Sequence, residues 1–173
     1  QKIKKTPIHI FSEKKGIHVR TNNLKDKNEL EKFKELKPDL IIVVAYGQII
    51  PDEYLNLPNL KFLNVHASLL PKWRGAAPIE RAILNGDKET GISIMKIEKK
   101  LDSGPYIKQV KIQIENETNS GELREKLSIL GATALKESID LILSKTENYK
   151  YQNEEEATYA KKIEKEERKI NWK

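Results

Sequence analysis

The longest apolar run of the chain, residues 40–46, reads Leu-Ile-Ile-Val-Val-Ala-Tyr. A continuous β-branched run of this length predicts a strand that is buried on both faces, as in a parallel sheet. A second short strand is predicted over residues 60–66, which lead into a Pro-containing loop. Residues 91–97 and 106–114 alternate apolar and polar side chains, and this period of two also predicts strands.

Helices are predicted where apolar side chains recur at steps of three and four residues. The longest covers residues 122–143, and shorter ones cover residues 28–36 and 78–84. A further helix begins at Pro7 with Thr6 as its cap, and residues 18–20 are predicted to form a short strand. Strands that alternate with helices predict an open α/β sheet, in which ligands bind beyond the carboxyl ends of the strands. The apolar periodicity is lost from Ser144 onward, which predicts a linker.

Composition and charge narrow the function classes. The 173 residues suit one domain of ordinary size, and the longest apolar run is too short to cross a membrane. No secretory signal is recognised, and the absence of cysteine excludes disulfides, thiolate nucleophiles and Cys-based zinc sites. The net charge of +6 lies entirely in residues 1–37, which hold 11 basic and 5 acidic side chains. This local excess would attract a polyanion, because charges are screened over roughly 10 Å.

Three places in the sequence carry candidate chemistry. Asn64 and His66 lie two residues apart at the end of a predicted strand, so their side chains share one face and could stabilise an oxyanion and move a proton. A structural histidine explains the same pattern. Asp102 lies in Leu-Asp-Ser-Gly-Pro, which is typical of a turn and by itself requires no catalytic role. The irregular segment 68–75 either packs as a loop or forms the wall of a ligand pocket.

A resemblance connects these places. Residues 64–79, Asn-Val-His-Ala-Ser-Leu-Leu-Pro-Lys-Trp-Arg-Gly-Ala-Ala-Pro-Ile, resemble the signature of the 10-formyltetrahydrofolate-dependent formyltransferases, and among them the methionyl-tRNA formyltransferases. The likeness extends through residues 44–51, 85–95 and 101–104, and resumes at 159–163 and 170–172. It implies an open Rossmann-like α/β sheet with helices on both faces, whose first strand would precede Gln1. Residues 1–145 would then form a partial catalytic domain, and residues 146–173 a linker toward a further domain.

The resemblance also implies site residues. The family's catalytic Asn, His and Asp fall on Asn64, His66 and Asp102. Two loops would hold the formyl donor, 10-formyltetrahydrofolate, with the residues Tyr46, Gly47, Gln48, Ile49, Ser68, Leu69, Leu70 and Pro71. The acceptor would be methionyl initiator tRNA, contacted by Lys2, Lys4, Lys5, Lys72 and Arg74. No metal is expected; the protein would be a monomer in a bacterial-type cytoplasm, or alternatively in an organelle matrix, with no membrane partner.

Other functions remain open at the level of the sequence. A formyltransferase that acts on a sugar-nucleotide amine would share the Asn, His and Asp and the Ser-Leu-Leu-Pro loop. A non-catalytic Rossmann-type dinucleotide-binding module would leave Asn64, His66 and Asp102 unexplained. A nucleic-acid-binding domain would use the basic N-terminus, but the aromatic content of 6% offers few side chains for base stacking. Lys99 and Lys100 depart from the family, which has a glycine near this position.

Overall fold

The computed structural model describes residues 4–169. The chain divides into two compact units, Gln1–Pro38 and Asp39–Lys173. The first unit contains helices α1 (Pro7–Lys14) and α2 (Lys27–Glu35). The Thr6 hydroxyl accepts a hydrogen bond from the backbone N–H of His9, which confirms the predicted cap of α1.

The strand predicted over residues 18–20 is not formed. Arg20 instead extends its side chain to Glu29 on α2, with Nη2 2.6 Å from Oε1, and Asn22 donates to the same carboxylate. The hydrogen bond and charge of Arg20 lower the pKa of Glu29. The segment is thus fixed by side-chain bonds to a buried carboxylate.

The second unit is built on a four-stranded mixed sheet with the order β1-β2-β4-β5. Its strands are β1 (Leu40–Val44), β2 (Lys61–His66), β4 (Glu89–Lys96) and β5 (Tyr106–Gln113). β1 and β2 are parallel, whereas β4 runs antiparallel to both β2 and β5. The predicted α/β class is confirmed, but the sheet is not wholly parallel. β1 is only partly buried, and Val44 is 59% exposed, because this strand borders β2 alone in the described sheet.

The remaining elements connect and cover these strands. They are the helices α3 (Asp52–Leu55), α4 (Pro78–Leu84) and α5 (Ser120–Leu143), the short strands β3 (Arg74–Gly75) and β6 (Tyr159–Ala160), and 3-10 turns at Glu154–Glu156 and Glu166–Arg168. α5 begins two residues earlier than predicted, because Asn119 and Glu122 form a capping box. None of the helices within residues 4–169 combines the length and the apolar character needed to span a membrane.

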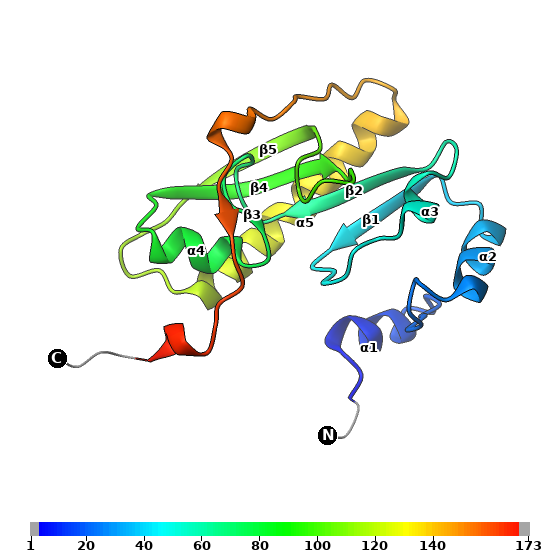
Figure 1. The fold of residues 1–173 in the computed structure, drawn as a ribbon, viewed down its shortest axis with the longest axis horizontal. Helices are drawn as coiled ribbons and strands as arrows, with labels where there is room; N and C mark the ends of the chain where they lie inside the picture. The colour runs from blue at the N-terminus through cyan, green and yellow to red at the C-terminus, as the bar shows by residue number, and fades with distance from the viewer. Residues whose placement is uncertain (1–3, 170–173) are drawn as a thin grey trace. The chain divides into compact units, whose positions relative to one another are not determined.

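The two faces of the sheet differ in chemistry. Leu63, Ile92 and Ile94 belong to the main core together with Leu123 and Leu127 of α5. α5 lies across this face of the sheet in Figure 1. Residues next along the strands point to the opposite face, and these include polar side chains of β2 and β4 (Asn64, His66 and Ser93). The strand alternation therefore separates the apolar core from the residues with candidate chemistry.

The segment after α5, for which the sequence predicts a linker, is built into the second unit. Lys150 exchanges backbone hydrogen bonds with Tyr106 of β5, and β6 pairs in parallel with β3. Figure 1 shows this segment (orange to red) passing from the end of α5 to lie beside β3. Lys150 and residues 158–160 thus pair through their backbones with β5 and with the region of β3, and the segment belongs to the same compact unit.

Gly91 on β4 provides a test of this packing. A Cβ at this position would lie 2.1 Å from the backbone oxygen of Val110 and 2.6 Å from Cδ2 of Leu69. We expect Gly91→Ala to lower the free energy of unfolding by roughly 1–3 kcal/mol, the usual cost of overpacking. Urea denaturation measures this change. Gly47→Ala is the matched control, because a Cβ there meets nothing within 4 Å, and equal stability of both variants would contradict the packing described.

Candidate active site

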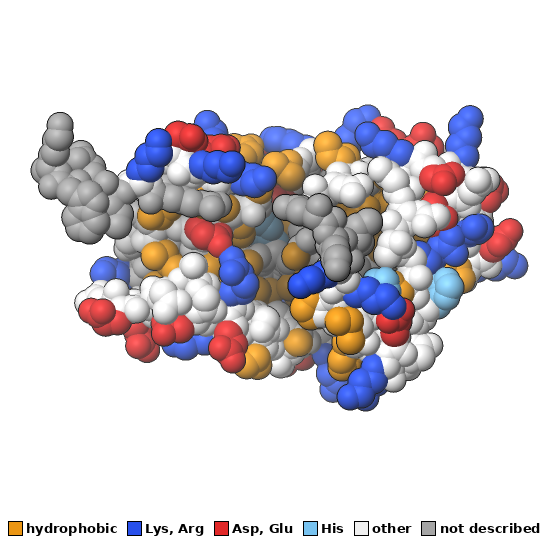
Figure 2. Space-filling model, turned by 90° about the horizontal axis from the view of Figure 1, so that it is seen from below, with side chains coloured by type: hydrophobic (Ala, Val, Ile, Leu, Met, Phe, Trp, Pro, Cys, Tyr) orange, Lys and Arg blue, Asp and Glu red, His pale blue; other side chains and the backbone are white. Residues whose placement is uncertain are grey.

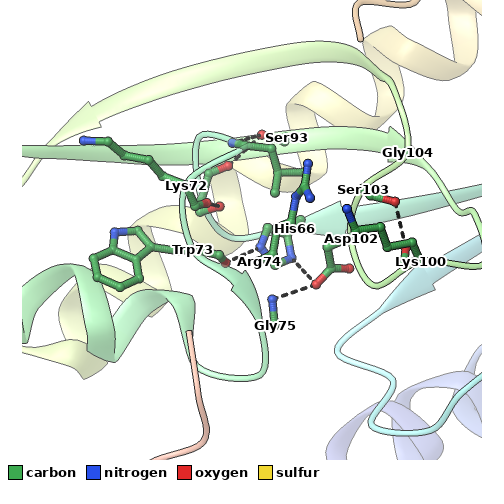
Figure 3. A network of polar contacts seen from close by, with 12 residues as sticks. His66, Lys72, Trp73, Arg74, Gly75, Ser93, Lys100, Asp102, Ser103 and Gly104 are labelled. Carbon is green, nitrogen blue, oxygen red and sulfur yellow. Dashed lines mark hydrogen bonds and ion pairs between the residues drawn. The ribbon is translucent and has the colours of Figure 1, made fainter. Parts of the chain in front are cut away.

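His66, the last residue of β2, is held at both ring nitrogens. Nε2 lies 2.8 Å from the backbone oxygen of Trp73, and Nδ1 lies 3.7 Å from Oδ2 of Asp102 (Figure 3). A carbonyl oxygen only accepts hydrogen bonds, so the contact with Trp73 assigns a proton to Nε2. Nδ1 is then the nitrogen that remains available, facing a carboxylate at a distance too long for a hydrogen bond. The side chain of His66 is only 6% exposed, which fixes the ring in this orientation.

Asp102 lies in the loop between β4 and β5 and reaches His66 from there. Its backbone φ of 47° is in the left-handed region, which Asp tolerates better than most residues. The carboxylate Oδ2 accepts a hydrogen bond of 2.8 Å from the backbone N–H of Gly75. The predicted turn and the predicted approach of Asp102 to His66 are therefore both present, and the turn is what presents the carboxylate.

Asn64 lies two residues before His66 on the same face of β2. Its backbone is opposite Val43 of β1 and Met95 of β4, so the residue lies in the interior of the sheet. The side chain is half-buried, and within residues 4–169 its amide forms no hydrogen bond. An amide N–H donor is thus left free beside the imidazole, and the three predicted residues Asn64, His66 and Asp102 gather at the carboxyl end of β2.

The predicted donor-binding loop 68–71 is fixed to the sheet by Ser93 of β4. The Ser93 hydroxyl donates to the backbone oxygen of Ser68 at 2.7 Å and accepts from the N–H of Leu70 at 3.1 Å. Gln109 of β5 adds a bond to the oxygen of Leu70, and the peptide bond between Leu70 and Pro71 is cis. Ser68 and Leu70 are buried, whereas Leu69 and Pro71 are half-buried. Hydrogen bonds from Ser93 and Gln109 thus fix the position of this loop, which follows His66 in the chain.

The second predicted donor-binding loop, residues 46–49, follows β1. β1 and β2 are parallel with Val44 opposite Val65, so this loop and His66 leave the sheet at the same edge. Tyr46 is 41% exposed and Ile49 is 88% exposed, and Gly47 and Gln48 are exposed as well. Ile49 is thus an open apolar side chain in the loop that is predicted to hold the donor.

The residues predicted to contact tRNA fall in different environments. Lys2 lies outside the described residues; Lys4 and Lys72 are exposed, and Lys5 pairs with Glu13, with Nζ 2.6 Å from Oε1. Figure 2 shows cationic and anionic side chains interspersed over the visible face. Arg74 is fully buried, which contradicts the expectation that its guanidinium is presented to an anion at the surface.

Arg74 instead binds the segment after α5. Its Nη2 lies 2.7 Å from Oε1 of Glu154, and Nε and Nη2 both donate to Oε1 of Gln152. The hydrogen bonds from Arg74 and then from Lys100 lower the pKa of Glu154 to about 2. The hydrogen bond to Glu154 likewise raises the pKa of Arg74. The arginine of the Trp-Arg-Gly motif is therefore a structural cation inside the second unit.

Sequence reasoning missed several groups that shape this site. The backbone oxygen of Trp73 and the N–H of Gly75 bind His66 and Asp102, yet a residue type does not reveal a backbone contact. Their only sequence signal is that Pro71 and Gly75 make the segment irregular. Gln152 lies in a polar segment without periodicity, so nothing singled it out. No group of three or more His, Asp or Glu side chains in residues 4–169 is placed to hold a metal ion.

Comparisons with known proteins identify relatives of the chain. The methionyl-tRNA formyltransferase of Pelagibacter ubique is 53% identical over 99% of the chain and 56% of its own length. In solved structures, HypX from Aquifex aeolicus in complex with tetrahydrofolic acid matches 83% of this chain and 24% of its own, at 20% identity and a TM-score of 0.74. A sugar N-formyltransferase from a Shewanella species matches 90% of this chain and 60% of its own, at 25% identity and a TM-score of 0.71.

These comparisons establish the family. The chain spans about half the length of the curated relatives it matches. The sequence model of the formyl transferase family matches residues 1–139, which contain Asn64, His66 and Asp102. By this match and by its identity to curated relatives over nearly its full length, the chain belongs to the formyl transferase family.

Proposed function

We propose that the protein transfers the formyl group of 10-formyltetrahydrofolate to the α-amino group of methionine on initiator tRNA. The observation that carries the proposal is the gathering of Asn64, His66 and Asp102 at the carboxyl end of β2, in a chain whose relatives are named methionyl-tRNA formyltransferase. Only the second unit is needed to assemble these three residues.

The geometry suits an acyl transfer. The acceptor amine attacks the formyl carbon, a bond to this carbon forms, and the carbonyl oxygen becomes an oxyanion. Asn64 has a free amide N–H to donate to this oxygen, and His66 donates through Nδ1 when the ring is protonated, because Nε2 is already bound to Trp73. Asp102 stabilises the protonated ring and accepts the proton that the attacking amine loses. The bond from carbon to the folate nitrogen then breaks, and the proton passes to that nitrogen.

The donor would lie along the two loops that flank this edge. Residues 46–49 leave β1 beside the end of β2, and residues 68–71 follow His66 directly. Ser93 and Gln109 hold residues 68–71 in place, so that a bound folate would meet a loop whose position is already fixed. The predictions that the protein is a monomer and works in the cytoplasm stay predictions.

The roles of the three residues can be tested separately from folate binding. We expect His66→Ala and Asp102→Asn each to abolish formyl transfer, and Asn64→Ala to lower kcat by roughly 10²–10³, the effect of losing one oxyanion donor. Donor binding should persist in all three variants, because the two loops are anchored through other residues. Single-turnover transfer and equilibrium folate binding are the measurements. Near-normal turnover of His66→Ala would remove this residue from the reaction.

The identity of the acceptor distinguishes a methionyl-tRNA formyltransferase from a formyltransferase that acts on a sugar-nucleotide amine. We expect the full-length protein to formylate charged initiator tRNA and to leave a sugar-nucleotide amine unmodified. The relative at 53% identity bears the tRNA enzyme's name, whereas the sugar N-formyltransferase is 25% identical, and this difference favours tRNA. Transfer from radiolabelled donor to each acceptor is the assay. Activity on the sugar amine alone would contradict the proposed acceptor.

The lysines near the N-terminus are proposed to contact tRNA phosphates. We expect replacement of Lys2, Lys4 and Lys5 by Ala to weaken tRNA binding and to flatten its dependence on salt. With fewer phosphate contacts, fewer counterions are released from the tRNA when the protein binds. Binding measured between low and high salt reports the slope. Alanine at Lys25, Lys27 and Lys32 is the matched control of equal charge loss, and an equal change of slope in both triple variants would indicate a general charge effect.

A further inference from the structure

The segment that follows α5 connects the two loops that hold His66. Its first part bonds to the loop of Asp102: Gln152 Nε2 donates to the backbone oxygens of Asp102 at 2.9 Å and Gly104 at 2.7 Å. Its last part bonds to the loop of Trp73, whose N–H donates to Oγ1 of Thr158 at 2.9 Å. The two groups that face the nitrogens of His66 are thus carried by loops tied to one short stretch of chain.

All hydrogen-bond donors and acceptors of the Gln152 side-chain amide are used in this arrangement. Oε1 accepts two hydrogen bonds from Arg74, at 3.0 Å from Nε and 2.8 Å from Nη2, while both N–H groups are given to the loop of Asp102. A primary amide offers two donors and one oxygen with two acceptor positions, and here all are used. If the amide were turned over, its N–H groups would face the N–H groups of Arg74, and its oxygen would face the backbone oxygens of Asp102 and Gly104. The site therefore requires an amide in this orientation.

These bonds close a ring around Asp102. The Arg74 side chain binds Gln152, which binds the carbonyl of Asp102, and the Asp102 carboxylate accepts from Gly75, the residue that follows Arg74. Figure 3 shows the carboxylate of Asp102 contacting both Gly75 and His66. Asp102 has a φ of 47°, a conformation that costs energy for a residue with a side chain unless its surroundings hold it.

Burial gives the ring its rigidity. Arg74 is fully buried, and Glu154 supplies the neutralising charge through two hydrogen bonds, 2.7 Å from Nη2 and 3.1 Å from Nη1. Lys100, from the same loop as Asp102, donates to Oε2 of Glu154, the oxygen that also accepts from Nη1 of Arg74. A buried cation that lost these partners would be costly, so the segment cannot leave the loops without a penalty.

We propose that Gln152 and Arg74 are positioning residues for the formyl transfer, which hold Asp102 opposite Nδ1 of His66. This inference rests on the proposed function. Neither side chain faces the reacting atoms: Arg74 is fully buried, and the amide of Gln152 is spent on protein groups. In this proposal the segment after α5 contributes to catalysis, because it holds Asp102 in its orientation.

Gln152→Glu tests the proposal in the full-length protein. A glutamate keeps the acceptor toward Arg74 but loses both donors and sets a carboxylate against the two carbonyls. Because a misplacement of about 1 Å can cost roughly 10² in rate, we expect kcat to fall by about that factor, with the KM values for donor and acceptor near those of the wild type. The dependence of kcat on pH should also change in shape, whereas partial unfolding would only scale it.

Glu155→Gln is the matched control, since Glu155 is exposed in the same segment and its side chain bonds to no described residue. The NMR signal of the Gly75 amide reports the position of the Asp102 carboxylate directly, and we expect it to move in Gln152→Glu and to stay in the control. If Gln152→Glu does not fold, Gln152→Asn is measured instead, because its amide is too short by one methylene to span both partners.

Wild-type kcat, pH profile and Gly75 signal in a folded Gln152 variant would overturn the positioning role. Loss of kcat together with an unchanged Gly75 signal would overturn it as well, because Asp102 would not have moved. A wild-type protein that formylates no amine would instead contradict the proposed function. The two failures are therefore distinguishable.

Discussion

A buried cation organises the second unit. Arg74 has no exposed area, and a guanidinium removed from water needs both countercharge and hydrogen bonds. Glu154 and Gln152 supply them, and both belong to the segment after α5. The segment must therefore lie against the loop of residues 68–77. The same docking fixes the backbone on either side of Arg74, where the oxygen of Trp73 and the N–H of Gly75 bind His66 and Asp102.

The sheet separates stability from chemistry by simple alternation. Leu63, Ile92 and Ile94 face α5, and residues next to them along the same strands, such as Asn64 and Ser93, face the loops. The other face also buries Phe62 and Met95, but it carries the polar side chains of Asn64, His66 and Ser93 beside them. Ser93 and Gln109 then bind the 68–71 loop without competing with the core, which places the candidate site on a rigid surface.

Local patterns in the sequence predicted much of the fold, but few of the contacts that hold the candidate site residues in place. Helix α5 and strands β4 and β5 follow from periodicity, and the spacing of Asn64 and His66 places them on one face. Mixed strand directions did not follow, because an alternating strand has the same pattern in either direction. The approach of Asp102 to His66 came only from family resemblance, since it depends on a tertiary contact. Gln152 lacked any signal, because its role uses backbone oxygens of a distant loop.

Charge divides the chain in a way that bears on acceptor choice. Residues 38–173, which contain the candidate catalytic residues, hold as many acidic as basic side chains, so this part has no net charge to attract a polyanion. Affinity for an acceptor such as tRNA must then come from charges outside the reaction centre. The proposed transfer requires that an amine reach the formyl carbon beside Asn64 and His66. In the proposed reaction, the choice of acceptor therefore depends on residues other than Asn64 and His66, in a fold whose relatives are named for tRNA and for sugars.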